Sequence, residues 1–125
     1  MIYGIGTDII AVSRIEQALN RFGDRFARRI LAPAEWDGFK ASIHRARFVA
    51  KRFAAKESFA KALGTGMRFP VTWHNISIVH DALGRPGFGL VPELAQSLAQ
   101  RNICSHHLSI SDEAEMVVAF SVLEQ

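Results

Sequence analysis

The sequence predicts an α+β protein in which a small antiparallel β-sheet packs against one long central helix and several shorter helices. Two observations carry this prediction. The order along the chain is one strand, then helices, then strands with a single further helix, without the strand–helix alternation of a parallel sheet. Residues 47–63 also form a stretch long enough for a central helix. Because 125 residues is the usual size of one domain, residues 1–125 are expected to form a single domain.

The composition excludes several classes of protein. Apolar residues make up 49% of the chain and charged residues 22%, which indicates a packed core and not a disordered segment. A net charge of +3 is too small to predict nucleic-acid binding. The single Cys104 cannot form an intrachain disulfide and fits a reducing cytoplasm. We expect no signal peptide, because Met1 leads straight into a predicted strand, and no membrane partner, because no apolar run approaches about 18 residues.

The first predicted strand spans residues 2–12 and is rich in Ile and Val. Gly4 and Gly6 lie inside it, and glycine within a strand often marks a bulge or a close approach of another backbone. Asp8 stands among apolar residues of the same strand. A carboxylate in that setting either caps the next segment or binds a ligand.

Arginines are concentrated in the next two predicted helices. Ser13 and Glu16 have the spacing of a capping box, which predicts a helix over residues 13–22. Gly23 interrupts it, and a second helical piece follows over residues 24–31. Against only two acidic residues, this stretch carries Arg14, Arg21, Arg25, Arg28 and Arg29. It is either an ordinary solvated helix face or a docking surface for an acidic partner, since complementary charge speeds encounter.

A short helix is predicted over residues 33–41 and the central helix over residues 47–63. At about 100° per residue, one arc of the central helix carries Phe48, Val49, Phe53, Phe59, Ala60 and Leu63. The opposite side, expected to face water, carries Arg47, Lys51 and Ser58. Glu57 and Lys61 lie one turn apart at the border of the arc, whereas Arg52 and Lys56 fall inside it.

Two interpretations of these charges remain open. Glu57 and Lys61 alone can be an ordinary surface pair, worth a few tenths of a kcal/mol. That pair leaves Arg52 and Lys56 without a role, so the four residues either form a metal or phosphate site at the rim of the core or the two cations snorkel past the apolar ring. Gly64-Thr65-Gly66 then ends the helix, and Gly64 suits a left-handed terminal position.

The C-terminal half is predicted to be mainly β-structure. Strands are expected over residues 74–80 and 88–91, joined by a turn over residues 81–86, and a helix follows over residues 92–101. A hairpin pairs residues 107–111 with residues 116–123 through a turn at 112–115. His107 opens the first arm of that hairpin, where a surface position is the ordinary expectation.

Two motifs about fifty residues apart point to a known family. The first is Gly4-Ile5-Gly6-Thr7-Asp8, and the second runs from Arg52-Phe53-Ala54-Ala55-Lys56-Glu57 through Lys61 to Gly66. Asp81 through Gly84-Arg85-Pro86 and His107-Leu108-Ser109-Ile110-Ser111 add support. Over essentially its whole length the chain resembles the holo-acyl-carrier-protein synthase type of 4′-phosphopantetheinyl transferase. The resemblance implies transfer of the phosphopantetheine arm of coenzyme A to a serine of apo acyl carrier protein in fatty acid biosynthesis, with release of adenosine 3′,5′-bisphosphate.

The resemblance also implies roles for individual residues. Asp8 and Glu57 become Mg²⁺ ligands, and two carboxylates suit this ion, which keeps several waters and takes further ligands from substrate phosphates. Lys61 is implied to reach the same phosphates and to stabilise or protonate the leaving group. The residues implied to bind coenzyme A are Arg52, Lys61, Gly64, Thr65, Gly66, Pro86 and His107, with Arg52 and His107 as candidates for its 3′-phosphate. The base that accepts the serine proton is Glu57, a water on Mg²⁺ or a water held by Glu57.

Partners follow from the same resemblance. Carrier proteins are acidic, and the family docks them on its first helix, so Arg14, Arg21 and Arg25 become the expected contacts, with Phe22 and Phe26 as apolar anchors. The family is commonly homotrimeric, with active sites between subunits. One departure is visible: Asp112 stands where many members have histidine. An alternative function, a non-catalytic basic module that binds an acidic protein or nucleic acid, leaves Asp8 and Glu57 without a role.

Overall fold

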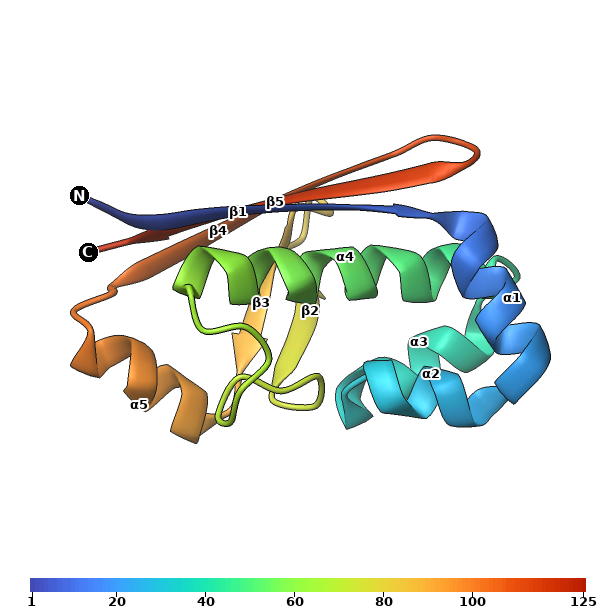
Figure 1. Cartoon of the computed structure of the whole chain (residues 1–125), viewed down its shortest axis with the longest axis horizontal. Helices are drawn as coiled ribbons and strands as arrows, with labels where there is room; N and C mark the ends of the chain where they lie inside the picture. Colours follow the sequence, from blue (N-terminus) through green and yellow to red (C-terminus); the bar gives the residue numbers. More distant parts are fainter.

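The computed structural model describes all 125 residues and confirms the predicted α+β class (Figure 1). Strand β1 (Ile2–Ala11) is followed by helices α1 (Val12–Phe22) and α2 (Asp24–Ile30), a 3₁₀ turn (Pro33–Glu35) and helix α3 (Trp36–Ala41). The long helix α4 (Arg45–Leu63) comes next. The chain closes with β2 (Ile76–His80), β3 (Pro86–Leu90), α5 (Pro92–Gln100), β4 (Ser105–Asp112) and β5 (Met116–Glu124). None of the helices combines the length and the apolar character that crossing a membrane requires.

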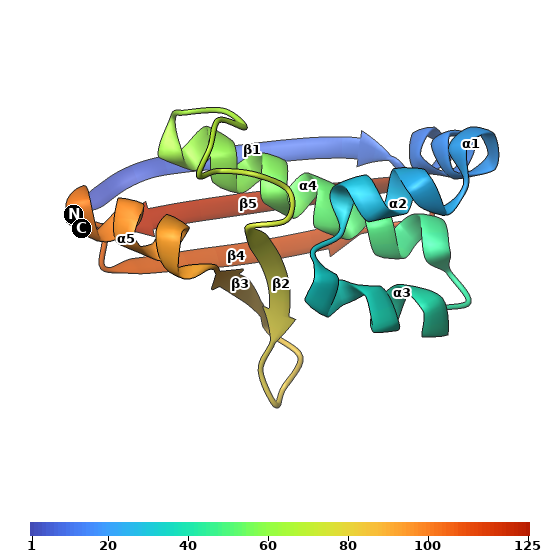
Figure 2. The same ribbon diagram turned by 90° about the horizontal axis from the view of Figure 1, so that it is seen from below.

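The main sheet has the antiparallel order β1-β5-β4, so the first and last strands of the chain are neighbours. Asp8 is paired with Ala119 of β5, which is paired in turn with Ile110 of β4. The two termini lie side by side (Figure 1), because the Gln125 amide donates to the Met1 carbonyl at 2.7 Å. A separate two-stranded sheet, β2-β3, lies beside β4 (Figure 2).

Helix α4 lies along one face of the main sheet, against β1 and β5 (Figure 1). Gly4 and Gly6 allow this close contact: a Cβ at Gly6 would stand 2.0 Å from the Ser58 carbonyl oxygen, and one at Gly4 would stand 1.9 Å from that of Ala62. The sequence-based prediction of a close backbone approach is therefore confirmed. The other face of the sheet is covered by no element of the chain, and its exposed apolar residues include Ile5, Ile9, Met116, Val118 and Phe120.

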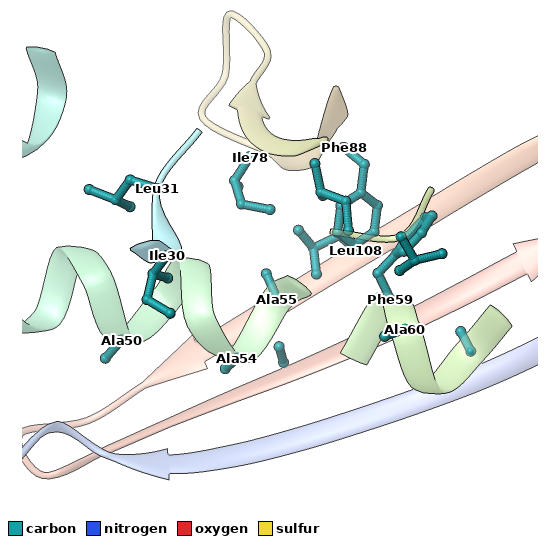
Figure 3. Close-up of a cluster of buried hydrophobic side chains, with 14 of the residues drawn as sticks. Ile30, Leu31, Ala50, Ala54, Ala55, Phe59, Ala60, Ile78, Phe88 and Leu108 are labelled. Atoms are coloured by element: carbon teal, nitrogen blue, oxygen red, sulfur yellow. The ribbon is translucent and has the colours of Figure 1, made fainter. Parts of the chain in front are cut away.

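The core surrounds α4 on more than one side. Phe59 of α4 contacts Phe88 of β3 edge-to-face, with ring centroids 4.9 Å apart. Figure 3 shows α4 side chains meeting residues of α2, the β2–β3 hairpin and β4 in one cluster. Because the sheet covers one side of the helix and the hairpin another, the single apolar arc predicted from periodicity is too narrow.

The prediction that Ser58 faces water is wrong, because this residue is fully buried. Its side chain lies on the sheet side of α4, where the Ser58 and Ser121 hydroxyl oxygens are 2.5 Å apart. The Ser58 hydroxyl also donates to the Ala55 carbonyl at 2.7 Å. Both hydroxyls are thus satisfied inside the core, which makes a buried serine tolerable.

The predicted capping box is also wrong. Helix α1 begins at Val12, directly after the strand, and no side chain caps it. The Val12 amide instead donates to the carbonyl of Glu115 at 2.8 Å, so the turn between β4 and β5 satisfies the first amide of the helix. Strand β2 begins two residues later than predicted because the chain turns at Asn75, whose side chain donates to the Pro70 carbonyl.

Candidate active site

Three predicted site residues come together between β1 and α4. Asp8 shares the inward row of β1 with Gly4 and Gly6, so its carboxylate points toward α4. The Lys61 ammonium is 3.3 Å from Asp8 Oδ1 and donates to the Thr7 carbonyl at 2.9 Å. The second carboxylate oxygen of Asp8, Oδ2, is buried and has no hydrogen-bond partner.

Glu57 precedes Lys61 by one helical turn and lies near the same carboxylate. Burial and the charge of Asp8 raise the pKa of Glu57, while Lys61 acts in the opposite direction. Two carboxylates next to one ammonium leave an excess of negative charge and one unpaired buried oxygen. This donor set fits a hard divalent cation such as Mg²⁺. Nowhere in the chain do three or more His, Cys, Asp or Glu side chains lie where they could hold a metal ion together, so an ion here would need water or substrate oxygens as its other ligands.

Lys56 is absent from this site. Its position excludes both roles that the sequence left open, which were binding a phosphate at the rim of the core and snorkelling past the apolar ring. All three protons of its buried ammonium have acceptors: Glu35 Oε1 at 2.6 Å, the Ile30 carbonyl at 2.8 Å and the Trp73 carbonyl at 2.9 Å. It neither snorkels nor has a proton left for a phosphate. Burial lowers the pKa of Lys56, and the charge of Glu35 opposes that change.

Arg52 also points toward Glu35. Its guanidinium lies 3.5 Å from the centroid of the Phe48 ring, and its Nε is 3.6 Å from Glu35 Oε2. That Nε is buried without a hydrogen-bond partner. These four of the charged residues of α4 therefore divide into two pairs. Glu57 and Lys61 face β1, whereas Arg52 and Lys56 face Glu35.

The glycine loop follows Lys61 directly. Gly64 ends α4 in the left-handed conformation with φ of 83°, and Gly66 also has a positive φ of 66°. Thr65 donates its hydroxyl to the Gly66 carbonyl at 2.9 Å. The loop therefore lies at the same end of α4 as Lys61, within reach of a ligand held there.

Pro86 and His107 line a different cavity, of about 690 Å³, between the β2–β3 hairpin and strand β4. His107 Nε2 is hydrogen-bonded to Glu124, which lowers the pKa of that carboxylate. His107 shares a cross-strand row with Val122 and the exposed Ile5, so its side chain lies on the uncovered face of the sheet. Within one chain, His107 and Asp8 are therefore on opposite faces of the same sheet.

The predicted docking residues lie together on α1 and α2. A hollow of about 480 Å³ is lined by Ala18, Phe22, Arg25, Phe26 and Arg29. Phe22 is 46% exposed, and the Arg21 guanidinium stands 5.1 Å from the centroid of its ring. Arg14 is exposed one helical turn before Ala18. A further hollow of about 540 Å³, between α1 and the start of α4, contains none of the predicted site residues.

Asp112 has a role that the sequence did not reveal. Its carboxylate is 3.0 Å from Arg47 and 3.5 Å from Lys51, both on α4. Arg47 also donates to the carbonyls of Glu113 and Ala114 at 2.6 and 2.7 Å. Asp112 therefore holds the β4–β5 turn against α4, and Arg47 does not point freely into water as predicted.

The model of the 4′-phosphopantetheinyl transferase superfamily matches residues 4–120, which include every site residue described above. The chain belongs to this superfamily. It is 54% identical to the holo-[acyl-carrier-protein] synthase of Nitrosomonas europaea over the full length of both proteins.

Solved structures of the superfamily agree in fold. The chain matches the crystal structure of the Neisseria meningitidis holo-[acyl-carrier-protein] synthase with a TM-score of 0.97 and 50% identity, and the match covers 100% of both chains. The Helicobacter pylori synthase, solved in complex with coenzyme A, has a TM-score of 0.83 and 31% identity, and the match covers 96% of this chain and 99% of that one.

Proposed function

We propose that this protein is a holo-[acyl-carrier-protein] synthase, which moves the 4′-phosphopantetheine of coenzyme A to a serine of apo acyl carrier protein. Relatives over the full chain have this name, and two of the similar solved structures are complexes described with coenzyme A. The single observation that carries the proposal is the convergence of Asp8, Glu57 and Lys61 between β1 and α4. The comparisons favour this reaction over a non-catalytic basic module.

The chemistry is a phosphoryl transfer. The serine oxygen forms a bond to the phosphorus that bears the pantetheine arm, and the bond from that phosphorus to the bridging oxygen of the pyrophosphate breaks. Adenosine 3′,5′-bisphosphate leaves. Lys61 stabilises the negative charge on the leaving phosphate, and Glu57, whose pKa is raised, holds the water that accepts the serine proton. We assign Asp8 and Glu57 as the Mg²⁺ ligands, and bound Mg²⁺ would supply positive charge to the pyrophosphate.

The direct test is mass spectrometry of the carrier. Incubation with coenzyme A, Mg²⁺ and an apo carrier protein should add the mass of one phosphopantetheine to the carrier. Omission of coenzyme A, or addition of a chelator, should prevent the gain. A folded, metal-loaded protein that leaves the carrier mass unchanged would rule out the proposed function. The exposed, unpaired Cys104 is consistent with the cytoplasm as the compartment of this reaction.

We further propose that the coenzyme A site is completed by a second copy of the chain in a homotrimer. Lys61, Gly64, Thr65 and Gly66 serve the pyrophosphate and pantetheine, while Arg52, Pro86 and His107 serve the nucleotide. His107 lies on the opposite face of the sheet from Asp8, so one chain cannot bring both to one ligand directly. The uncovered sheet face between them is apolar and supplies a surface for subunit contact.

Mixed oligomers test this arrangement. Glu57→Gln and His107→Ala chains should each be inactive alone. The two variants are then mixed, unfolded and refolded together. Some sites of the mixed oligomers should combine an intact Glu57 of one chain with an intact His107 of its neighbour, so part of the activity should return. Light scattering should report the mass of a trimer. A monomer, or no recovery in mixtures that form oligomers, would contradict a shared site.

The proposed carrier surface can be tested by charge reversal. Arg14→Glu should raise the Michaelis constant for an acidic carrier about tenfold, because it replaces an attractive charge by one that repels the carrier. The constant for coenzyme A should stay the same. Gln96→Glu with Gln100→Glu makes the same net-charge change on exposed positions of α5 and serves as the control. Equal effects on both substrates would indicate a folding defect.

The raised pKa of Glu57 gives a pH dependence with a defined sign. A carboxyl whose pKa is raised by folding favours the protonated form, so its contribution to stability is present below its ordinary pKa and is lost as the pH rises through the raised value. Metal-free protein should lose this contribution as the pH rises above about 4. Mg²⁺, which binds the ionised carboxylates, should stabilise the protein at the higher pH. Melting curves of wild type and Glu57→Gln, with and without Mg²⁺, isolate the effect. Identical pH profiles for the two proteins would contradict it.

A further inference from the structure

Glu35 is the only fully buried acidic side chain, and it joins four segments of the chain. Its Oε1 accepts from the Ala32 amide at 2.8 Å and from Lys56 at 2.6 Å. Its Oε2 accepts from the amide of Ile78 at 2.9 Å. Through Lys56 the network extends to the carbonyls of Ile30 and Trp73. It therefore connects the end of α2, helix α4, the loop before β2 and strand β2.

The contact with Ile78 is unusual because it occupies the outer edge of the hairpin. Strand β2 pairs only with β3, so its other edge has no strand neighbour. The Glu35 carboxylate takes the place of that neighbour for one amide, and Lys56 holds the chain just before the strand through the Trp73 carbonyl. A two-stranded sheet is marginally stable alone, so its position depends on such anchors.

The anchored hairpin forms one wall of the cavity that contains Pro86 and His107. Ile78 is paired with Phe88 of β3, and the Phe88 ring lies 5.8 Å from the ring of His106 on β4. A shift of Ile78 would therefore move Phe88 relative to β4 and change the width of the cavity. The path from Glu35 to the cavity passes through one backbone hydrogen bond and one cross-strand pair.

Stability alone does not account for a buried ion pair. Removing two charges from water costs free energy, and well-packed apolar residues of similar volume often stabilise a protein as much or more. The backbone contacts of this pair have no apolar equivalent, because methionine and leucine cannot bond to the Trp73 carbonyl or the Ile78 amide. Those contacts are what the charged residues add over an apolar core.

We propose that Glu35 and Lys56 are positioning residues that fix the β2–β3 hairpin against β4 and so set the affinity for the nucleotide end of coenzyme A. The inference rests on the proposed function, since it takes the cavity as the nucleotide site. Neither residue contacts the reacting groups around Asp8. They act through Ile78 and Trp73, and Glu35 also neutralises Arg52, whose Nε lies 3.6 Å from Glu35 Oε2.

Substrate-specific kinetics of Glu35→Gln test the proposal. The Michaelis constant for coenzyme A should rise roughly tenfold, as expected when a buried donor loses its charged partner. The constant for the carrier should stay within about twofold. Hydrogen exchange at the Ile78 amide should accelerate by more than the global loss of stability explains. Val117→Ala, in the sheet and outside the network, provides a control that loses stability without contacting Glu35.

A paired apolar replacement separates positioning from stability. Glu35→Leu with Lys56→Met removes both charges and should recover much of the melting temperature lost by Glu35→Gln, yet coenzyme A should still bind weakly. Wild-type affinity for coenzyme A in a folded double variant would overturn the proposal, as would equal effects of Val117→Ala. If the wild type does not bind coenzyme A at all, the proposed function is refuted instead. In that case, faster hydrogen exchange at the Ile78 amide of Glu35→Gln would still show that Glu35 holds the hairpin in place.

Discussion

Glu57→Gln is expected to lower kcat by about a thousandfold or more, because it removes one of the two carboxylates assigned to the metal and with it about 4 kcal/mol of transition-state stabilisation. The fold should survive. Burial and Asp8 disfavour the charge on Glu57, so the amide should leave the melting temperature of metal-free protein unchanged or higher at neutral pH. Steady-state transfer assays and melting curves measure the two effects separately.

The variant also tests the assigned ligand set. In wild type, Mg²⁺ should raise the melting temperature, because a ligand that binds only the folded state stabilises it. In Glu57→Gln this increase should be lost or much reduced. Glu93→Gln, an exposed position on α5, makes the same chemical change away from the site and should behave as wild type. Mg²⁺-dependent turnover that persists in Glu57→Gln would remove Glu57 from the ligands.

Gly6→Ala is expected to have the largest effect on stability. The new Cβ would stand 2.0 Å from the Ser58 carbonyl oxygen and 2.6 Å from the Ala62 nitrogen. Both atoms belong to the backbone of α4 and cannot rotate away, so strand and helix must separate. We expect a loss of about 3 kcal/mol and a fall in melting temperature of about 10 °C. Transfer should fall as well, because Asp8 lies two residues further along the displaced strand.

Gly87→Ala is the matched control for that experiment. Gly87 is also a strand glycine, but the nearest atom to its added Cβ is 3.9 Å away, on the Val79 side chain. Its melting temperature should remain close to that of wild type. If Gly6→Ala melts within about 2 °C of Gly87→Ala, a shift well below 1 kcal/mol, the close approach of β1 to α4 is not required for folding.

Local pattern was enough to predict most of the fold. The Ile- and Val-rich N-terminal run, the long stretch ending at Gly64 and the C-terminal hairpin all formed, with boundaries shifted by a few residues. The glycines at positions 4 and 6 correctly indicated a close backbone approach. Errors arose where a partner from a distant segment replaced the local one. Helix α1 began at Val12, whose amide donates to the Glu115 carbonyl, and no cap formed at Ser13.

By itself, the sequence determined the elements and their order, because periodicity and glycine positions are local properties of the chain. That Asp8 meets Glu57 and Lys61 was implied only by the family resemblance. Only the tertiary structure decided which charges share a site. It paired Lys56 with Glu35, 21 residues away, buried Ser58 against Ser121 and placed His107 on the opposite face of the sheet from Asp8. Burial changes the free energy of a charge or hydroxyl only through the groups that enclose it, and those groups come together only when distant segments pack.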